Sequence, residues 1–257
     1  MKLCRFEIAS HPGEPRSGFL HGSKVYETDG AEASAVHDWT DLIPLSPIGR
    51  PPSIRLFTTL DAPGGFSSPE APLLPFQYLN PSALIAPSRE LERPAFAVRL
   101  AMEPCLAAVV ASPARDVSPE EAEDLLLGIT IANCFVAHEW DGVDRSARAR
   151  DVAVAFGPFL TTPDELMEVA RDPGTSLYEL RGVVRVNAQE VGEFDLGDLK
   201  HSLAEYASHA AESCALAEGD VLLVGPLWSP ERPLSLEPAD EVQVFIDRLG
   251  TLATRIV

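Results

Sequence analysis

Two apolar segments at a fixed interval constrain the fold of this chain more than any other feature. Residues 106–110 form a continuous apolar run, and residues 129–134 form a second, mostly apolar run. A short continuous apolar run predicts a strand that is covered by protein on both faces. Cys105 and Cys134, at the edges of these runs, are 29 residues apart. The chain is therefore expected to build its core around two buried strands.

The composition limits the class of protein and its partners. The chain has 257 residues, which suits one large domain or a small domain attached to a larger one. Its net charge of −19 argues against nucleic acid and anionic membrane surfaces as partners, because their phosphates would be repelled. No apolar run approaches the ~18 residues of a membrane span, and residues 1–7 do not resemble a signal peptide. Four cysteines in a chain of this length indicate the reducing cytoplasm, and we expect Cys4 and Cys214 to be buried thiols.

Prolines and glycines divide the chain into two parts. Strand and turn patterns occupy roughly the first quarter of the chain, where prolines at positions 44, 47, 51 and 52 prevent a continuous helix or central strand. A long loop rich in proline and glycine then extends to position 75. We therefore expect a small β-rich N-terminal region over residues 1–65 and a larger C-terminal domain over residues 66–257.

Three helices are predicted in the second part. Ser118 and Thr162 each precede a proline and then acidic residues, the signal of an N-cap and first helical turn. The first of these helices is expected to carry Leu126 inward. A third helix is predicted over residues 199–216, with Cys214 on its apolar stripe. Strands nevertheless outnumber helices, and few have the helical crossovers that parallel strands require, so the predicted class is α+β, mainly β.

Further motifs accompany the two runs in a fixed order. They are residues 80–85, 156–162, 186–187, 216–221 and 236–257. With Glu103-x-Cys105 and Asn133-Cys134, this order resembles the fumarylacetoacetate hydrolase superfamily from Asn80 to the end of the chain. The resemblance implies a mixed β-sandwich roll, usually assembled as a homodimer. It also implies enzymes that cleave, decarboxylate, isomerise or hydrate oxo-acids through an enolate-like intermediate.

The metal site that the resemblance implies is altered in this chain. Family members hold a divalent cation on three carboxylates, at positions that are Glu103, Cys105 and Cys134 here. Glu103 and Cys105 are two residues apart on a strand and are expected to share one face. Zinc would suit such a soft site better than magnesium. A disulfide, or a cavity filled by two buried thiols without metal, are the alternatives, and no cofactor is assigned.

Candidate catalytic residues follow the second apolar run. His138 stands where the resemblance places an arginine that contacts the substrate carboxylate, Glu139 stands at an aspartate, and Arg148 stands at a lysine. Because imidazole titrates near neutrality, His138 and Glu139 are predicted to transfer protons, while Arg148 holds an anionic oxygen. The predicted substrate-binding residues are Asn80, Ser82, Asp141, Gly225 and Trp228.

The function predicted from these residues is that of a divergent enzyme acting on an enolisable oxo-acid or β-dicarbonyl, by tautomerisation, decarboxylation or C–C bond cleavage. Hydrolysis ranks lower, because residues 56–63 lack the His/Glu pair that the family's lid carries. One alternative is a catalytically inactive member that binds a small molecule or a partner protein. A second is a thiol or zinc site at Cys105 and Cys134, although neighbouring carboxylates disfavour reactive thiolates.

Overall fold

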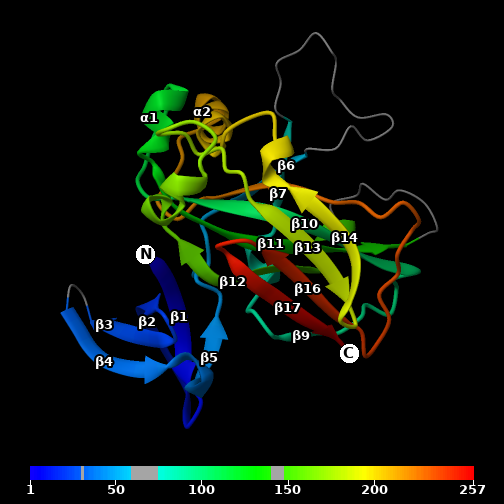
Figure 1. The fold of residues 1–257 in the computed structure, drawn as a ribbon. Coiled ribbons are helices and arrows are strands. Elements are labelled where there is room, and N and C mark those ends of the chain that lie inside the picture. Colours follow the sequence, from blue (N-terminus) through cyan, green and yellow to red (C-terminus); the bar gives the residue numbers. More distant parts are fainter. Residues whose placement is uncertain (30–31, 59–74, 140–147) are drawn as a thin grey trace.

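Two β-sheets make up most of the computed structural model, which describes residues 1–29, 32–58, 75–139 and 148–257 (Figure 1). The predicted α+β class with a mainly β core is confirmed. The strands are β1 (Lys2–Ile8), β2 (His11–His21), β3 (Lys24–Asp29), β4 (Glu32–Asp38), β5 (Leu42–Leu45), β6 (Ile54–Thr58), β7 (Phe76–Leu79), β8 (Leu84–Ile85), β9 (Glu90–Leu91), β10 (Arg99–Val110), β11 (Leu126–His138), β12 (Ala153–Thr161), β13 (Arg181–Val186), β14 (Gln189–Asp195), β15 (Val221–Gly225), β16 (Glu241–Ile246) and β17 (Gly250–Ile256). The helices are α1 (Pro119–Glu123) and α2 (Leu203–Ser213), with 3₁₀ segments at Trp39–Asp41, Pro81–Ala83, Arg148–Arg150, Pro163–Val169 and Leu196–Asp198.

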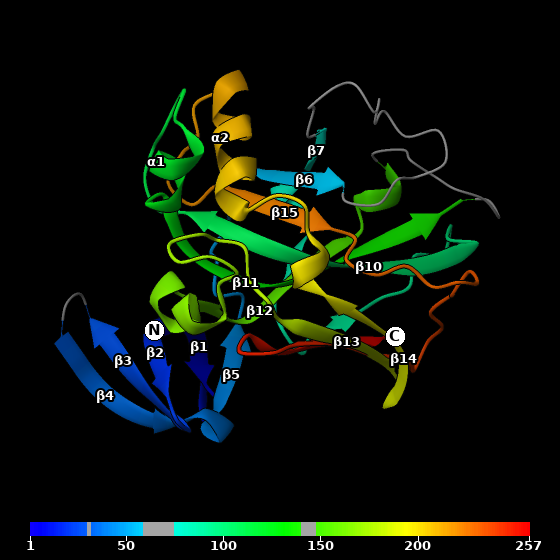
Figure 2. The same ribbon diagram turned by 45° about the horizontal axis from the view of Figure 1, so that its top comes forward.

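The larger sheet runs in the order β4-β3-β2-β1-β12-β11-β10-β15-β6-β7, with β5 paired to β1 and β8 to β12. Strand β1 pairs with β12, so the N-terminal strands extend the same sheet, in blue at one side of Figure 2. Strand β6 pairs in parallel with β15. Strands from before residue 65 thus pair with strands from after it. The predicted domain boundary at residue 65 lies outside the described residues and stays a prediction.

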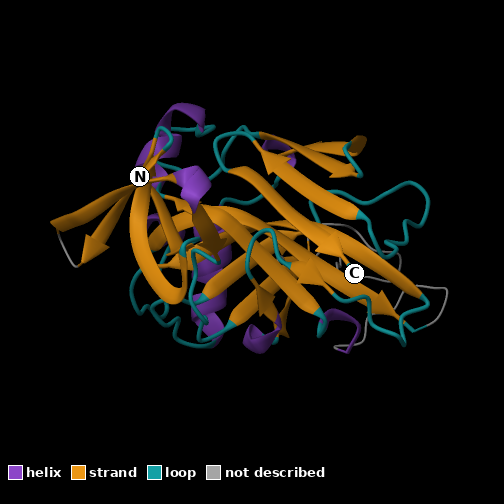
Figure 3. Cartoon of the chain, turned by 90° about the horizontal axis from the view of Figure 1, so that it is seen from below, coloured by secondary structure: helices purple, strands orange, loops and turns teal. Residues whose placement is uncertain are grey.

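The smaller sheet, in the order β14-β13-β16-β17-β9, packs on the larger one. Strands β11 and β12 contact β16 and β17, and the layers of strands are visible from below in Figure 3. In β16 the side chains of Val242, Val244 and Ile246 are buried, whereas the intervening residues are partly or fully exposed. The main core lies between the two layers and includes Phe135 and Leu252.

Strands β10 and β11 lie at the centre of the larger sheet and are covered on both faces, as their apolar runs predicted. All side chains of residues 104–110 and 128–138 are buried. Cys4 in β1 is also buried, as expected. Among the residues that the structure describes, no helix is long and apolar enough to cross a membrane.

The two α-helices pack against each other beside the larger sheet (Figure 1). A capping box at Ser118 starts α1 as predicted, but the helix ends after five residues and Leu126 begins β11 instead. The predicted helix after Thr162 is only a 3₁₀ segment, whose N-cap side chain makes no capping hydrogen bond. Cys214 is exposed, not buried, because α2 ends at Ser213 and the extended backbone of Cys214 takes its side chain off the helical stripe.

A capping box at Ser202 sets the start of α2. The Ser202 hydroxyl accepts from the backbone N–H of Glu205 at 3.2 Å, and the Glu205 carboxylate accepts from the N–H of Ser202 at 2.6 Å. We expect Ser202→Ala to lower the free energy of unfolding by about 1 kcal/mol, because one helical N–H loses its partner. Urea denaturation measures the change, and Ser112→Ala at an exposed loop position is the matched control. Equal stability of the two variants would contradict the capping role.

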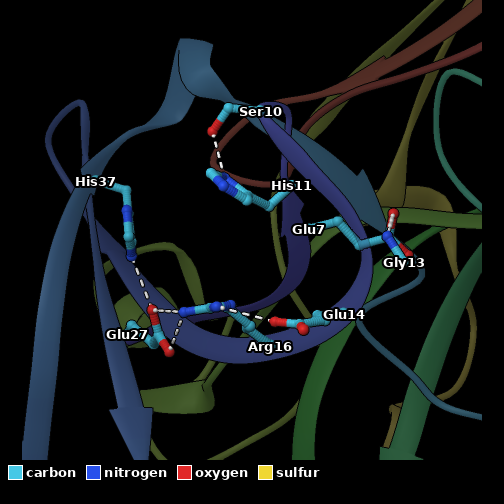
Figure 4. A network of polar contacts seen from close by, with 8 residues as sticks. All are labelled: Glu7, Ser10, His11, Gly13, Glu14, Arg16, Glu27 and His37. Carbon is cyan, nitrogen blue, oxygen red and sulfur yellow. Dashed lines mark hydrogen bonds and ion pairs between the residues drawn. The ribbon is translucent and has the colours of Figure 1, made fainter.

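A polar network joins β2, β3 and β4 in the N-terminal region (Figure 4). The carboxylate of Glu27 accepts hydrogen bonds from Arg16 at 3.0 Å and contacts Nε2 of His37 at 2.8 Å. Burial opposes ionisation of Glu27, but the hydrogen bonds from His37 and Arg16 outweigh it and lower the pKa of this carboxyl. Arg16, Glu27 and His37 thus join β2, β3 and β4 through their side chains.

Candidate functional site

The pairing of β10 with β11 fixes which side chains of the candidate site share a face. Arg99 lies opposite His138, and Glu103 lies opposite Cys134, with no register shift between these pairs. Opposite residues in antiparallel strands project to the same side, and so do alternate residues along one strand. The residues that project from this face of the sheet are Arg99, Glu103, Cys105, Cys134 and His138.

Arg150 holds the carboxylate of Glu103 in a bidentate ion pair. Its Nε donates to Oε2 at 3.2 Å, and its Nη2 donates to Oε1 at 2.5 Å. The side chains of Arg150 and Glu103 are only 14% and 18% exposed. Bidentate pairs between arginine and a carboxylate are among the strongest and most directional hydrogen-bonded contacts in proteins. Glu103 is therefore already neutralised by a cation that the chain itself supplies.

Cys105 and Cys134 are buried free thiols whose Sγ atoms lie 4.0 Å apart. A disulfide would need about 2.05 Å, so the site holds two thiols and no bridge. The hydrogen bond with Cys134, followed by burial, raises the pKa of the Cys105 thiol well above its usual value. The backbone of Gly225 closes over this thiol: a Cβ at Gly225 would lie 2.4 Å from Sγ of Cys105. This half of the site is tightly packed around two buried thiols.

These residues do not fit the divalent cation that the family resemblance implies. Magnesium prefers several oxygen ligands, whereas the site offers the single carboxylate of Glu103, already bonded to Arg150. Two Sγ atoms 4.0 Å apart can share a zinc ion at about 2.3 Å per bond, but zinc needs further ligands. Within the described part of the chain, no group of three or more His, Cys, Asp or Glu side chains can hold a metal ion. The cation that the structure places beside Glu103 is the guanidinium of Arg150.

Glu139 and Arg148 form an ion pair just beyond the end of β11. The guanidinium of Arg148 also lies 4.5 Å from the ring centroid of Phe96. The side chain of Arg148 is 64% exposed, so water screens this pair. The structure thus brings two of the predicted catalytic residues together at the surface, while His138 is buried on the sheet face. Asp141, a predicted substrate-binding residue, lies outside the described residues.

The other predicted substrate-binding residues occupy separate places. Asn80 donates to Asp151 at 2.8 Å. Ser82 accepts from Arg50 at 2.7 Å and lines a pocket of about 320 Å³.

Trp228 packs on Gly192 of β14 and lines a pocket of about 540 Å³, whose lining among the described residues includes neither Glu103 nor a cysteine. Of the predicted substrate-binding residues, Gly225 is the one that the structure places against the cysteines. A substrate contact for Asn80, Ser82 or Trp228 stays a prediction.

Two cationic residues of the site carry no motif that singles them out in the sequence. Arg99 precedes Glu103 by four residues, so the alternation of a strand is enough to place both on one face. Arg150 reaches Glu103 across 47 positions, from the 3₁₀ segment Arg148–Arg150, and no spacing rule connects them. The first could be found from the strand pattern, while the second depends on how the chain returns to the sheet.

Cysteine alkylation tests the thiol alternative. We expect iodoacetamide at neutral pH to modify Cys214 in the native protein and to leave Cys4, Cys105 and Cys134 unmodified. The thiolate is the reactive form, and burial raises the pKa of Cys4 to about 12. Peptide mass spectrometry measures the modification, and urea-unfolded protein, in which all four thiols react, is the control. Rapid native modification of Cys105 or Cys134 would establish an accessible thiolate at the site.

The sequence and the fold both match known proteins. The family profile described as fumarylacetoacetate (FAA) hydrolase C-terminal matches residues 62–257, most of the chain. The chain therefore belongs to the fumarylacetoacetate hydrolase family.

Individual relatives support the same assignment. The chain is 29% identical over 190 residues to Protein Rv2993c of Mycobacterium tuberculosis, covering 72% of this chain and 68% of that one. It is 26% identical over 187 residues to the mitochondrial oxaloacetate tautomerase fahd2 of Xenopus laevis, covering 68% and 56% respectively. The crystal structure of 5-carboxymethyl-2-hydroxymuconate delta-isomerase from Mycobacterium smegmatis superimposes with a TM-score of 0.79, at 22% identity and over 100% of this chain and 99% of that one. This likeness extends the shared fold to the N-terminal strands.

Proposed function

We propose that this chain is an enolate-forming enzyme that catalyses keto–enol tautomerisation of a small oxo-acid. The observation that carries the proposal is the shared face of β10 and β11. On this face His138 lies opposite Arg99. Four residues further along β10 lies Glu103, which is paired with Arg150. About 13 Å of strand separates the two positions. The pair between them, Ala101 opposite Val136, presents only apolar side chains on this face. The relative from Xenopus laevis, named an oxaloacetate tautomerase, supports this reaction.

Tautomerisation needs only the groups that this face supplies. One proton leaves the carbon beside the carbonyl and one proton is added to the carbonyl oxygen, so the reaction consumes no water or co-reactant. Imidazole takes and returns protons near neutral pH, which makes His138 the proton carrier. Guanidinium groups donate to the substrate carboxylate and to the oxygen on which negative charge develops. Decarboxylation and C–C bond cleavage pass through the same enolate and are further reactions for the assay to detect.

A second candidate function is binding without turnover. Neutralisation of Glu103 by Arg150 and the packing of Gly225 on Cys105 remove the ligand positions on which the family's chemistry depends. These contacts favour a member that binds an oxo-acid or a partner protein and does not transform it. The homodimer and the cytoplasmic location also remain proposals, and light scattering of the purified protein tests the first.

An assay with freshly dissolved oxaloacetate separates the two functions. The approach to keto–enol equilibrium is followed by ultraviolet absorbance of the enol, with and without protein, in a buffer that does not itself catalyse the exchange. Acylpyruvates are tested in parallel, and released carbon dioxide and pyruvate report decarboxylation. Acceleration proportional to protein concentration is the expected result. No acceleration with any of these compounds, while they still raise the melting temperature, would overturn the enzyme and establish the binding protein.

A further inference from the structure

The charges around Glu103 balance without a metal ion. One carboxylate, that of Glu103, remains at the three ligand positions, and Arg150 supplies the positive charge that pairs with it. A divalent cation bound to Glu103 would have to lie beside the positive charge of Arg150, between side chains that are only 14% and 18% exposed. An unbalanced charge that is withdrawn from water is costly. The two carboxylates that are missing would have balanced a divalent cation, and the one that remains is balanced by Arg150.

The geometry of the ion pair leaves Arg150 able to bind a second anion. A guanidinium carries five N–H donors in a planar fork. The bonds to Glu103 use the edge formed by Nε and Nη2, so the amino group at Nη1 is directed away from that carboxylate. The pKa of Cys105 is raised chiefly by the hydrogen bond with Cys134 and by burial, yet the charge of Arg150 acts on this thiol in the opposite direction. The guanidinium is thus close to two of the three ligand positions.

We propose that the guanidinium of Arg150 takes the place of the family's divalent cation. One edge holds Glu103, and the remaining donors bind a carboxylate or enolate oxygen of the substrate. The inference rests on the proposed function for the identity of that substrate, but it assigns a role that needs no turnover to be measured. Arg150 becomes the specificity-determining residue for an anionic oxygen, and binding becomes independent of metal.

Oxalate is the probe, because it is a planar dianion that resembles the enolate of an oxo-acid and does not react. Its binding to untagged full-length protein is measured by isothermal titration calorimetry in buffer that contains EDTA, after elemental analysis of the same sample. We expect the wild-type protein to carry far less than one metal ion per chain and to bind oxalate in EDTA. Stoichiometric metal, or oxalate binding that EDTA abolishes, would overturn the proposal.

Two substitutions separate the guanidinium from a metal. Arg150→Met is expected to weaken oxalate binding by about tenfold or more, since charged hydrogen bonds contribute about 1.5–3 kcal/mol. Glu103→Gln removes the competing carboxylate but keeps the arginine, so binding is expected to be equal or tighter. If oxalate bound through a metal ion, Glu103→Gln would weaken binding, because Glu103 would be the one carboxylate ligand of that metal. Arg115→Met removes the same charge from an arginine that is 65% exposed and is the matched control.

The remaining outcomes are equally decisive. Unchanged oxalate binding in Arg150→Met, or lost binding in Glu103→Gln, would overturn the assignment. If Arg150→Met does not fold, Arg150→Lys serves in its place: it keeps the charge without the planar fork and is expected to bind oxalate more weakly than wild type. Oxalate binding that depends on Arg150, together with no tautomerase activity, would refute the proposed function and leave this inference standing. Tautomerase activity that requires a metal ion and is unchanged in Arg150→Met would refute this inference and leave the proposed function standing.

Discussion

Replacement of His138 with glutamine is expected to slow tautomerisation of the oxo-acid by about 10²–10⁴-fold, the usual contribution of a positioned general acid–base group. Glutamine retains hydrogen-bonding capacity but cannot take up a proton at neutral pH. The loss should appear in kcat, because His138 is assigned to the proton transfer and Arg150 to the binding of the anion. Steady-state kinetics with oxaloacetate measure both constants.

Two controls accompany this variant, because His138 is only 7% exposed and a substitution there can disturb the sheet. Its melting temperature must stay close to that of the wild type for the kinetic result to count. His201→Gln changes a histidine whose side chain is 40% exposed, and its activity should match the wild type. A folded His138→Gln protein with wild-type turnover would remove the imidazole from the mechanism.

Replacement of Asp220 with alanine is expected to destabilise the fold by about 3–5 kcal/mol, the cost of breaking a buried ion pair from one side. Its carboxylate accepts from Nη1 of Arg55 at 3.0 Å, and both side chains are only 4% exposed. Ser53 and the backbone N–H of Ala217 also donate to it, at 2.8 and 2.9 Å. The substitution leaves the charge of Arg55 buried without its anion, at the point where β6 meets β15. Chemical denaturation, with the midpoint and slope fitted separately, measures the loss.

Asp38→Ala is the matched control for this prediction, because Asp38 pairs with Lys24 and both side chains are 49% exposed. Exposed pairs contribute only about 0–1 kcal/mol, so the control should remain close to wild type. Adding Arg55→Met to Asp220→Ala should recover part of the stability, since no uncompensated charge remains. A loss for Asp220→Ala no larger than that of Asp38→Ala would show that water reaches the Arg55 charge.

Strand alternation and capping chemistry allowed much of this fold to be predicted. The apolar runs of β10 and β11 specify strands that are buried on both faces, and alternation alone places Glu103 and Cys105 on one face. The serine caps of both helices are likewise local, because each bond joins residues three positions apart. The predictions fail where a local signal ends: Leu126 and Cys214 continue a helical pattern in sequence but lie outside the helices.

Motifs and apolar runs in the sequence were enough to predict the family and the buried centre of the sheet. The group that balances the charge of Glu103 could be found only from the folded structure. Arg150 meets Glu103 across 47 positions, and Arg55 meets Asp220 across 165. The physical reason is that burial makes an unpaired charge costly wherever its partner lies along the chain, so pairing is set by proximity in space. Alternation along β10 predicts which face of the sheet the Glu103 side chain occupies. Its partner, Arg150, is set by how a distant segment packs against that face.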